Sequence, residues 1–314
     1  MSNSPILVGD LLVLLCDART KPFLVAVDAK SGRVRWRSER EQGMESFSTP
    51  VVFTPPRGPA QVLVSGSFRL DAHSVETGER LWFTRRLGYL PKGVPVLGSN
   101  MVYVSAPGTD QPTGPPFAEF LQKYDADGNG RITREDGGKD EFFRDHFGFA
   151  DTNGDGVIDE TEYNFIRTAG VGDHGLVAIR LGGSGEVTQT NLQWRYTKTY
   201  PNIPAPLLYK GVLYLVKTGG IITSLDPATG DVFKTDRTKD ALGEYFSSPV
   251  AADDKIFTIN DAGKVTVLKA GRQWEILVVN DLGEECWATP AIAGGRIYIR
   301  TRNALYSFGK PGPR

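Results

Sequence analysis

The sequence is poor in cysteine and has almost no net charge. Its two cysteines, Cys16 and Cys286, lie too far apart in the chain to form a C-x-x-C redox pair or a thiolate zinc site. The 36 basic and 37 acidic side chains leave a formal net charge of -1, so no global field attracts nucleic acid or an anionic membrane. We therefore expect no nucleic-acid partner.

Long apolar runs are also missing. No stretch approaches the roughly 18 uninterrupted apolar residues of a membrane-spanning helix, so no membrane span is expected. The apolar run from Ile6 to Cys16 has no Lys or Arg before it and is interrupted by Gly9 and Asp10. We interpret this run as strands and expect no signal peptide in this chain.

What the sequence does contain is a repeat, punctuated by many glycines and prolines. Six prolines each introduce an apolar run, a turn and a second apolar run: Pro5, Pro50, Pro95, Pro206, Pro249 and Pro290. They are spaced by 45, 45, 111, 43 and 41 residues. One repeat of about 43 residues, with a single insertion of about 68 residues in the third copy, accounts for this spacing.

Each copy continues with a third strand, a polar turn and a fourth strand that ends on an aromatic residue in most copies. These aromatics are Trp36, Trp82, Trp194 and Phe233. Four short strands in 40 to 45 residues are typical of a propeller blade. We predict an all-β, six-bladed β-propeller of four-stranded antiparallel sheets, in which the aromatics are wedges between blades. The sixth copy has three strands, so its fourth strand is missing.

One frame in the repeat resembles a known family. The pattern A-x-D-x-x-[ST]-G-x-x-x-W, from Ala26 to Trp36 and in degraded form from Ala72 to Trp82, is similar to the blade motif of PQQ-like β-propeller repeat proteins. That group includes quinoprotein dehydrogenases and a non-catalytic propeller of the outer-membrane assembly machinery. The resemblance implies an exported, extracytoplasmic protein. It also implies closure of the last blade by an N-terminal strand; an open or differently closed blade is the alternative.

The insertion contains two twelve-residue loops with the EF-hand pattern of alternating oxygen ligands and a central glycine. The first loop supplies Asp125, Asp127, Asn129, the Arg131 carbonyl and Asp136. The second loop supplies Asp151, Asn153, Asp155, the Val157 carbonyl and Glu162, with Asp159 acting through water. We predict two calcium sites in a small α-helical insertion of the third blade. The predicted parts are residues 1–106, 107–173 and 174–314.

The two loops differ at position 12. Asp136 replaces the usual Glu there, and its shorter side chain makes closure of the site by both oxygens harder. We predict that the site from Asp151 to Glu162 is the stronger one and that the first site tolerates magnesium. The spacing of Phe117, Phe120 and Tyr124 predicts a helix before the first loop.

No catalytic motif is apparent, and no adjacent-cysteine pair is present to hold a quinone, so PQQ is not expected. One set of residues shares a repeat register, with a glutamate five residues before a repeat proline and an aromatic two places later. The set is Glu45, Phe47, Glu244, Phe246, Glu285 and Trp287. These residues predict an acidic, aromatic pocket at the channel mouth for a cationic or sugar-like ligand; the alternative is three solvated carboxylates.

The favoured function is a calcium-binding, non-catalytic binding or scaffold module for an unknown protein or carbohydrate ligand. The alternative is a quinoprotein-type dehydrogenase or a carbohydrate-active enzyme with its site at the channel mouth. A third possibility is a calcium-gated docking element mounted on an inert propeller.

Overall fold

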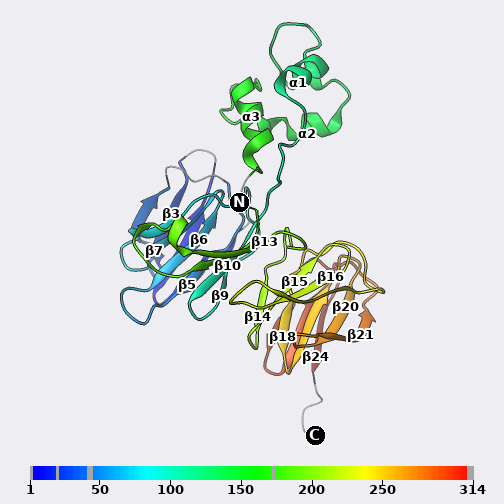
Figure 1. The fold of residues 1–314 in the computed structure, drawn as a ribbon. Helices are drawn as coiled ribbons and strands as arrows, with labels where there is room; N and C mark the ends of the chain where they lie inside the picture. Colours follow the sequence, from blue (N-terminus) through cyan, green and yellow to red (C-terminus); the bar gives the residue numbers. More distant parts are fainter. Residues whose placement is uncertain (1–2, 19–20, 41–44, 172–173, 310–314) are drawn as a thin grey trace. The chain divides into compact units, whose positions relative to one another are not determined.

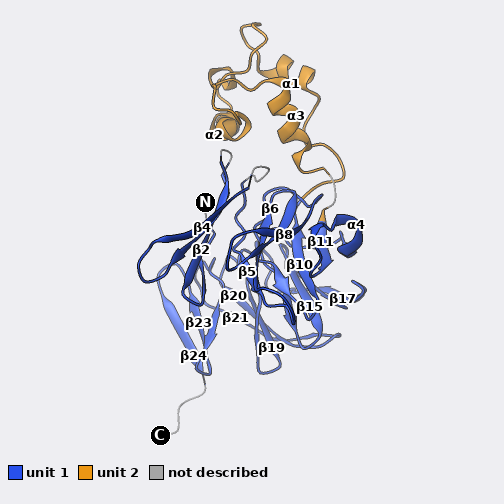
Figure 2. Cartoon of the chain, turned by 90° about the vertical axis from the view of Figure 1, so that its left-hand side faces the viewer, with its two compact units in different colours: residues 1–107, 175–314 blue, residues 108–174 orange. Residues whose placement is uncertain are grey.

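The computed structural model describes residues 3–18, 21–40, 45–171 and 174–309. The chain divides into two compact units, residues 1–107 with 175–314 and residues 108–174. Figure 2 colours the two units separately.

In the residues that the structure describes, the larger unit contains six sheets of mainly antiparallel strands that follow one another along the chain (Figure 1). The first three sheets contain β1 (Ile6–Val8), β2 (Leu11–Cys16), β3 (Phe23–Asp28) and β4 (Val34–Glu39); β5 (Val51–Phe53), β6 (Gln61–Gly66), β7 (Arg69–Ser74) and β8 (Arg80–Thr84); and β9 (Val96–Leu97), β10 (Met101–Ala106), β11 (Gly175–Arg180) and β13 (Leu192–Tyr196). The fourth and fifth contain β14 (Leu207–Tyr209), β15 (Val212–Lys217), β16 (Ile221–Leu225) and β17 (Val232–Arg237); and β18 (Val250–Ala252), β19 (Lys255–Ile259), β20 (Lys264–Lys269) and β21 (Glu275–Asp281). In the described residues the sixth sheet has three strands, β22 (Ala291–Ala293), β23 (Arg296–Arg300) and β24 (Leu305–Gly309).

This arrangement confirms the predicted propeller of repeated sheets, with one difference in the second sheet. That sheet gains a fifth, parallel strand, β12 (Gly185–Glu186), which comes from the third repeat and pairs with Trp82 and Phe83 of β8. The segment continues into the short helix α4 (Thr188–Asn191), and the Thr188 hydroxyl accepts a hydrogen bond from the Arg85 amide at 2.9 Å. The glycine-rich stretch that looks like a simple turn therefore ties two blades together.

The sheets pack face to face in sequence order. Each of five apolar clusters takes its buried members from two consecutive sheets, from the first and second through to the fifth and sixth. Alternation of side chains along each strand makes this possible, because a blade between two neighbours buries both of its faces. The inner strands β9, β14, β18 and β22 also contact one another in that order.

The aromatic residues of the outer strands act as the predicted wedges. The Trp36 indole donates to the Val75 carbonyl in the turn after β7 at 2.9 Å, and the Trp194 indole donates to the Pro227 carbonyl in the turn after β16 at 3.2 Å. Gly230 has a φ of +78°, and a Cβ there would lie 2.7 Å from the Trp194 ring. The turn glycine is therefore required both for its backbone conformation and for the space that the tryptophan occupies.

The smaller unit contains α1 (Phe117–Tyr124), the 3-10 helix η1 (Glu135–Gly137), α2 (Glu141–Ala150) and α3 (Glu160–Ala169). Its core is built around Ile132, Phe143, Phe147 and Ile158, all buried. Half-buried aromatics of α1 pack on this core, with the rings of Phe120 and Tyr163 stacked at 4.1 Å. The predicted helix before the first loop is confirmed.

Candidate metal centre

The second acidic loop is shaped by the two helices that flank it. Asp151 is the C-cap of α2, and Asp159 is the N-cap of α3, where its carboxylate accepts from the Glu162 amide at 2.8 Å. Glu162 completes a capping box by accepting from the Asp159 amide, which fixes it in the first turn of the helix. The helix start therefore points the Glu162 carboxylate back over the loop.

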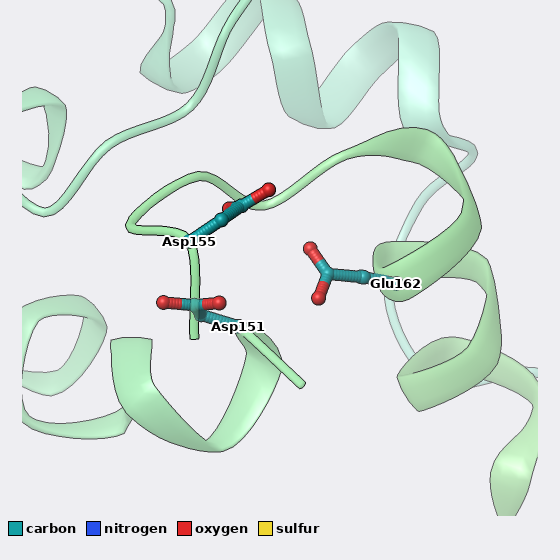
Figure 3. Close-up of side chains that lie close together, drawn as sticks. All are labelled: Asp151, Asp155 and Glu162. Atoms are coloured by element: carbon teal, nitrogen blue, oxygen red, sulfur yellow. The ribbon is translucent and has the colours of Figure 1, made fainter. Parts of the chain in front are cut away.

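Three carboxylates converge at this loop. Asp151, Asp155 and Glu162 each place an oxygen so that the three atoms lie within 4.8 Å of one another. Figure 3 shows Glu162 extending from α3 toward the two aspartates of the loop. Such a group of hard oxygen ligands suits a divalent cation such as calcium.

Hydrogen bonds within the loop hold these carboxylates in place. Glu162 Oε1 accepts from the amides of Thr152 and Asn153, at 2.7 and 3.0 Å, and its side chain is buried. Asp151 accepts from the amides of Gly154 and Gly156, at 2.7 and 3.0 Å. These amide donors offset part of the repulsion between the carboxylates and preorganise the loop for a cation.

The remaining predicted ligands of the second loop lie beside this group. The Asn153 amide side chain donates to Asp155 Oδ2 at 3.1 Å, and Asp155 Oδ1 accepts from the Val157 amide at 2.9 Å. The backbone around Val157 continues into the buried Ile158, whose amide donates to the Ile132 carbonyl at 2.8 Å. This bridge pairs the two loops with each other.

The first loop is organised differently at its closing residue. Asp125 accepts from the Gly130 amide at 2.9 Å, and Asp127 accepts from the Asn129 amide at 3.1 Å, so both aspartates face the loop backbone beside Arg131. Asp136 instead accepts from the hydroxyl and amide of Thr133, both at 2.7 Å. These two bonds hold the pKa of Asp136 below its ordinary value. Among the described residues, the first loop forms no group of three close carboxylates.

Of the six residues predicted for the channel mouth, Phe246 and Trp287 contact each other, and each of the other four has a different partner. The rings of Phe246 and Trp287 meet at 5.3 Å, while Phe47 donates its amide to the Pro91 carbonyl at 3.0 Å. Glu244 accepts from the Thr218 hydroxyl at 2.7 Å, and Glu285 forms an ion pair with Arg302. Ser67 donates to the backbone carbonyl of Glu45 at 2.6 Å.

A buried charged cluster between the first two sheets is not apparent from the sequence. Arg40 donates to Asp17 at 2.7 Å and to Asp71 at 2.6 Å, and Arg69 donates to Asp71 at 2.6 Å. Burial alone would raise the pKa of Asp71, but the two arginines hold it below its ordinary value. For Asp17, burial outweighs Arg40 and raises the pKa. The two positive and two negative charges balance, and the ion pairs join the first two sheets.

The comparisons with known proteins agree with this architecture. The family described as outer membrane protein assembly factor BamB matches residues 1–114 and 159–310, which is most of the chain.

The chain belongs to this family.

Two stretches of this BamB-family chain, residues 117–136 and 143–166, match the EF hand family. The chain is therefore a PQQ-type β-propeller that carries EF-hand calcium-binding motifs. No curated protein shows a significant match. In the part of the chain that the structure describes, no helix is both long and apolar enough to cross a bilayer.

Solved structures show the same fold at low sequence identity. The crystal structure of BamB from Moraxella catarrhalis has a TM-score of 0.57 and 14% identity, over 96% of this chain and 67% of that one. A europium-containing methanol dehydrogenase has a TM-score of 0.53 and 12% identity, over 95% of this chain and 65% of that one. The chain thus spans about two thirds of the length of either protein.

Proposed function

We propose that this chain is a calcium-stabilised binding or scaffold module, in which the propeller is the recognition surface and calcium orders the inserted helical unit. The observation that supports calcium most directly is the convergence of Asp151, Asp155 and Glu162 within 4.8 Å. Residues 108–174 carry 15 acidic and 6 basic side chains, a formal charge of -9, so bound divalent cations relieve a large self-repulsion.

Two sites of unequal strength follow from the same geometry. In the second loop, the carboxylate of Glu162 faces the other ligands and needs little rearrangement to close the site. In the first loop, both bonds from Thr133 end on one oxygen of Asp136, Oδ2, and the shorter side chain makes closure of the site by both oxygens harder. We therefore assign the tighter site to residues 151–162.

The proposed role of the propeller is protein recognition. Its support is the family's description as an assembly factor and the rigid packing of consecutive sheets, which presents fixed surfaces. We also propose an extracytoplasmic location. Calcium loops of modest affinity fill at roughly 0.1 to 1 mM calcium, a concentration range that fits extracellular modules.

Calorimetric titration of the full chain with calcium tests the metal sites. We expect two binding events, and Glu162→Gln should abolish the tighter one because a neutral amide cannot close the site with two charged oxygens. Glu160→Gln is the matched control, since Glu160 is exposed in the same helical turn and is not a predicted ligand. An absence of heat at millimolar calcium would refute the proposal.

The enzymatic alternative is tested separately. PQQ is added to the calcium-loaded chain, and quinone absorbance and dye reduction with alcohols or sugars are followed. We expect neither signal. Turnover of a sugar or alcohol would replace the scaffold proposal with an enzyme.

A further inference from the structure

One tryptophan differs from the others in its exposure. Trp287, in the segment between β21 and β22, is 65% exposed, whereas Trp36, Trp82 and Trp274 are buried. Its ring meets the half-buried Phe246 ring at 5.3 Å, with the ring planes inclined by 36°. Two inclined rings form an apolar corner, and an indole left this open to water favours a ligand that covers it.

An open hollow of about 700 Å³ adjoins Trp287. It is lined by Glu285, Trp287, Ala288, Arg300, Thr301 and Arg302. Its volume is in the range of sites for small molecules, which combine an apolar wall with a few polar groups.

The part of the lining that follows β23 is held by hydrogen bonds. The Thr301 hydroxyl donates to Glu284 at 2.7 Å, and the Arg302 amide donates to the Glu285 carbonyl at 2.9 Å. Glu284 also accepts from the Asn303 amide at 3.2 Å, so its carboxylate is engaged with the turn and does not line the hollow. The turn after β23, which carries Arg302 and directly follows Arg300, is therefore preformed.

The charges that line the hollow favour an anion. Glu285 is paired with Arg302, with Nη1 3.1 Å from Oε2, and the exposed Arg300 adds a second guanidinium. One carboxylate and two guanidiniums leave the lining with a net positive charge. This differs from the acidic character that the glutamate register predicts, because the sequence pattern does not include the arginines of β23 and the turn after it.

We propose that this hollow binds small carboxylates that carry a ring, with the ring against Trp287 and Phe246 and the carboxylate paired with Arg300. Guanidinium groups match the planar geometry of a carboxylate, and the indole face packs against a sugar or aromatic ring. The inference rests on the proposed function in one respect, since it takes the propeller as the recognition surface. Two sources supply this chemistry: a sugar acid, and the aromatic C-terminus of a peptide.

The test uses the calcium-loaded full chain, with binding followed by calorimetry and tryptophan fluorescence. Glucuronate is compared with glucose and with glucosamine, and N-acetylphenylalanine with its amide. We expect at least one carboxylate to bind with a Kd about tenfold or more below that of its neutral counterpart. The arm that responds identifies the source as sugar or peptide.

Three variants make the outcome specific. Trp287→Ala should abolish binding. Arg300→Gln should weaken binding of the carboxylate until its Kd equals that of its neutral counterpart. Arg237→Gln removes an exposed arginine of β17 that does not line the hollow, and it should bind like the parent chain. Tighter binding of glucosamine, no saturable binding of either carboxylate, or unchanged binding by Trp287→Ala would each overturn the inference. Calcium binding would be unaffected by any of these outcomes, so the calcium proposal is judged separately.

Discussion

Replacement of Arg40 by methionine should strongly destabilise the propeller. The guanidinium is fully buried between the first two sheets and is the ion-pair partner of both Asp17 and Asp71. Methionine preserves much of the apolar stem but leaves the Asp17 carboxylate buried without its cation. Removing one partner of a buried pair typically costs about 3 to 5 kcal/mol. For a domain of this size, that loss corresponds to a fall in Tm of roughly 6 to 20 °C.

The assay is denaturant and thermal unfolding of the full chain, followed by tryptophan fluorescence. Lys264→Met is the matched control, because the Lys264 ion pair with Asp281 is equally short at 2.7 Å but lies at the surface. That variant should lose less than about 1 kcal/mol. The double variant Arg40→Met with Asp17→Asn should recover part of the loss, since it leaves the neutral Arg69–Asp71 pair.

Two results would refute this reasoning. Equal stability losses for Arg40→Met and Lys264→Met would show that burial does not determine how much an ion pair contributes to the free energy of unfolding. A double variant less stable than Arg40→Met alone would show that the uncompensated Asp17 carboxylate is not the source of the loss.

Three further predictions address other parts of the chain. Gly230→Ala should destabilise the propeller by about 1 to 3 kcal/mol, because φ is +78° and the new Cβ meets the Trp194 ring. A Tm equal to that of the parent chain would contradict the close packing of Trp194 against this turn. Burial lowers the pKa of the His73 imidazole from 6.5 to about 4. As the pH drops from 6.5 to 4, His73 is protonated in the unfolded chain before it is protonated in the folded chain, so the free energy of unfolding falls. The loss approaches about 3 kcal/mol, and His73→Asn should flatten this part of the stability profile, measured by urea unfolding at each pH. Chelation of calcium should lower the melting transition of residues 108–174 in calorimetry while the propeller transition remains; loss of both transitions together would make calcium a requirement of the whole fold.

The repeat made most of the propeller predictable, because proline, apolar run and turn recur at a nearly constant spacing and the strands need only local pairing. The strand β12 was not predictable in the same way. Its sequence around Gly185 is typical of a turn, and its pairing with β8 depends on a partner about a hundred residues earlier. Local patterns carry no information on such a contact.

The calcium loops and the buried charged cluster differ in how far the sequence determined them. The calcium loops are contiguous, so the order of their oxygen ligands alone predicted which residues face one another, and Glu162 lies near Asp151 and Asp155. The charged cluster at Arg40 joins three separate strand regions. Arginines and aspartates are usually exposed, and the one available signal was a charged pair, Arg69 and Asp71, that alternates with the apolar Leu70 and Ala72 in one strand.

The connection to the inserted unit has an evolutionary consequence. The chain leaves β10 at Ala106 and returns in β11 at Gly175, and these two residues are register partners. Within the insertion, Thr109 and Val171 form a parallel bridge, so its two ends lie side by side. A segment with adjacent ends can be acquired or deleted at a single hairpin without shifting any strand of the host sheet. Related propellers can therefore differ by this entire unit and keep the same sheets. Insertion of the unit into the β10–β11 hairpin of another propeller requires no change in its strands.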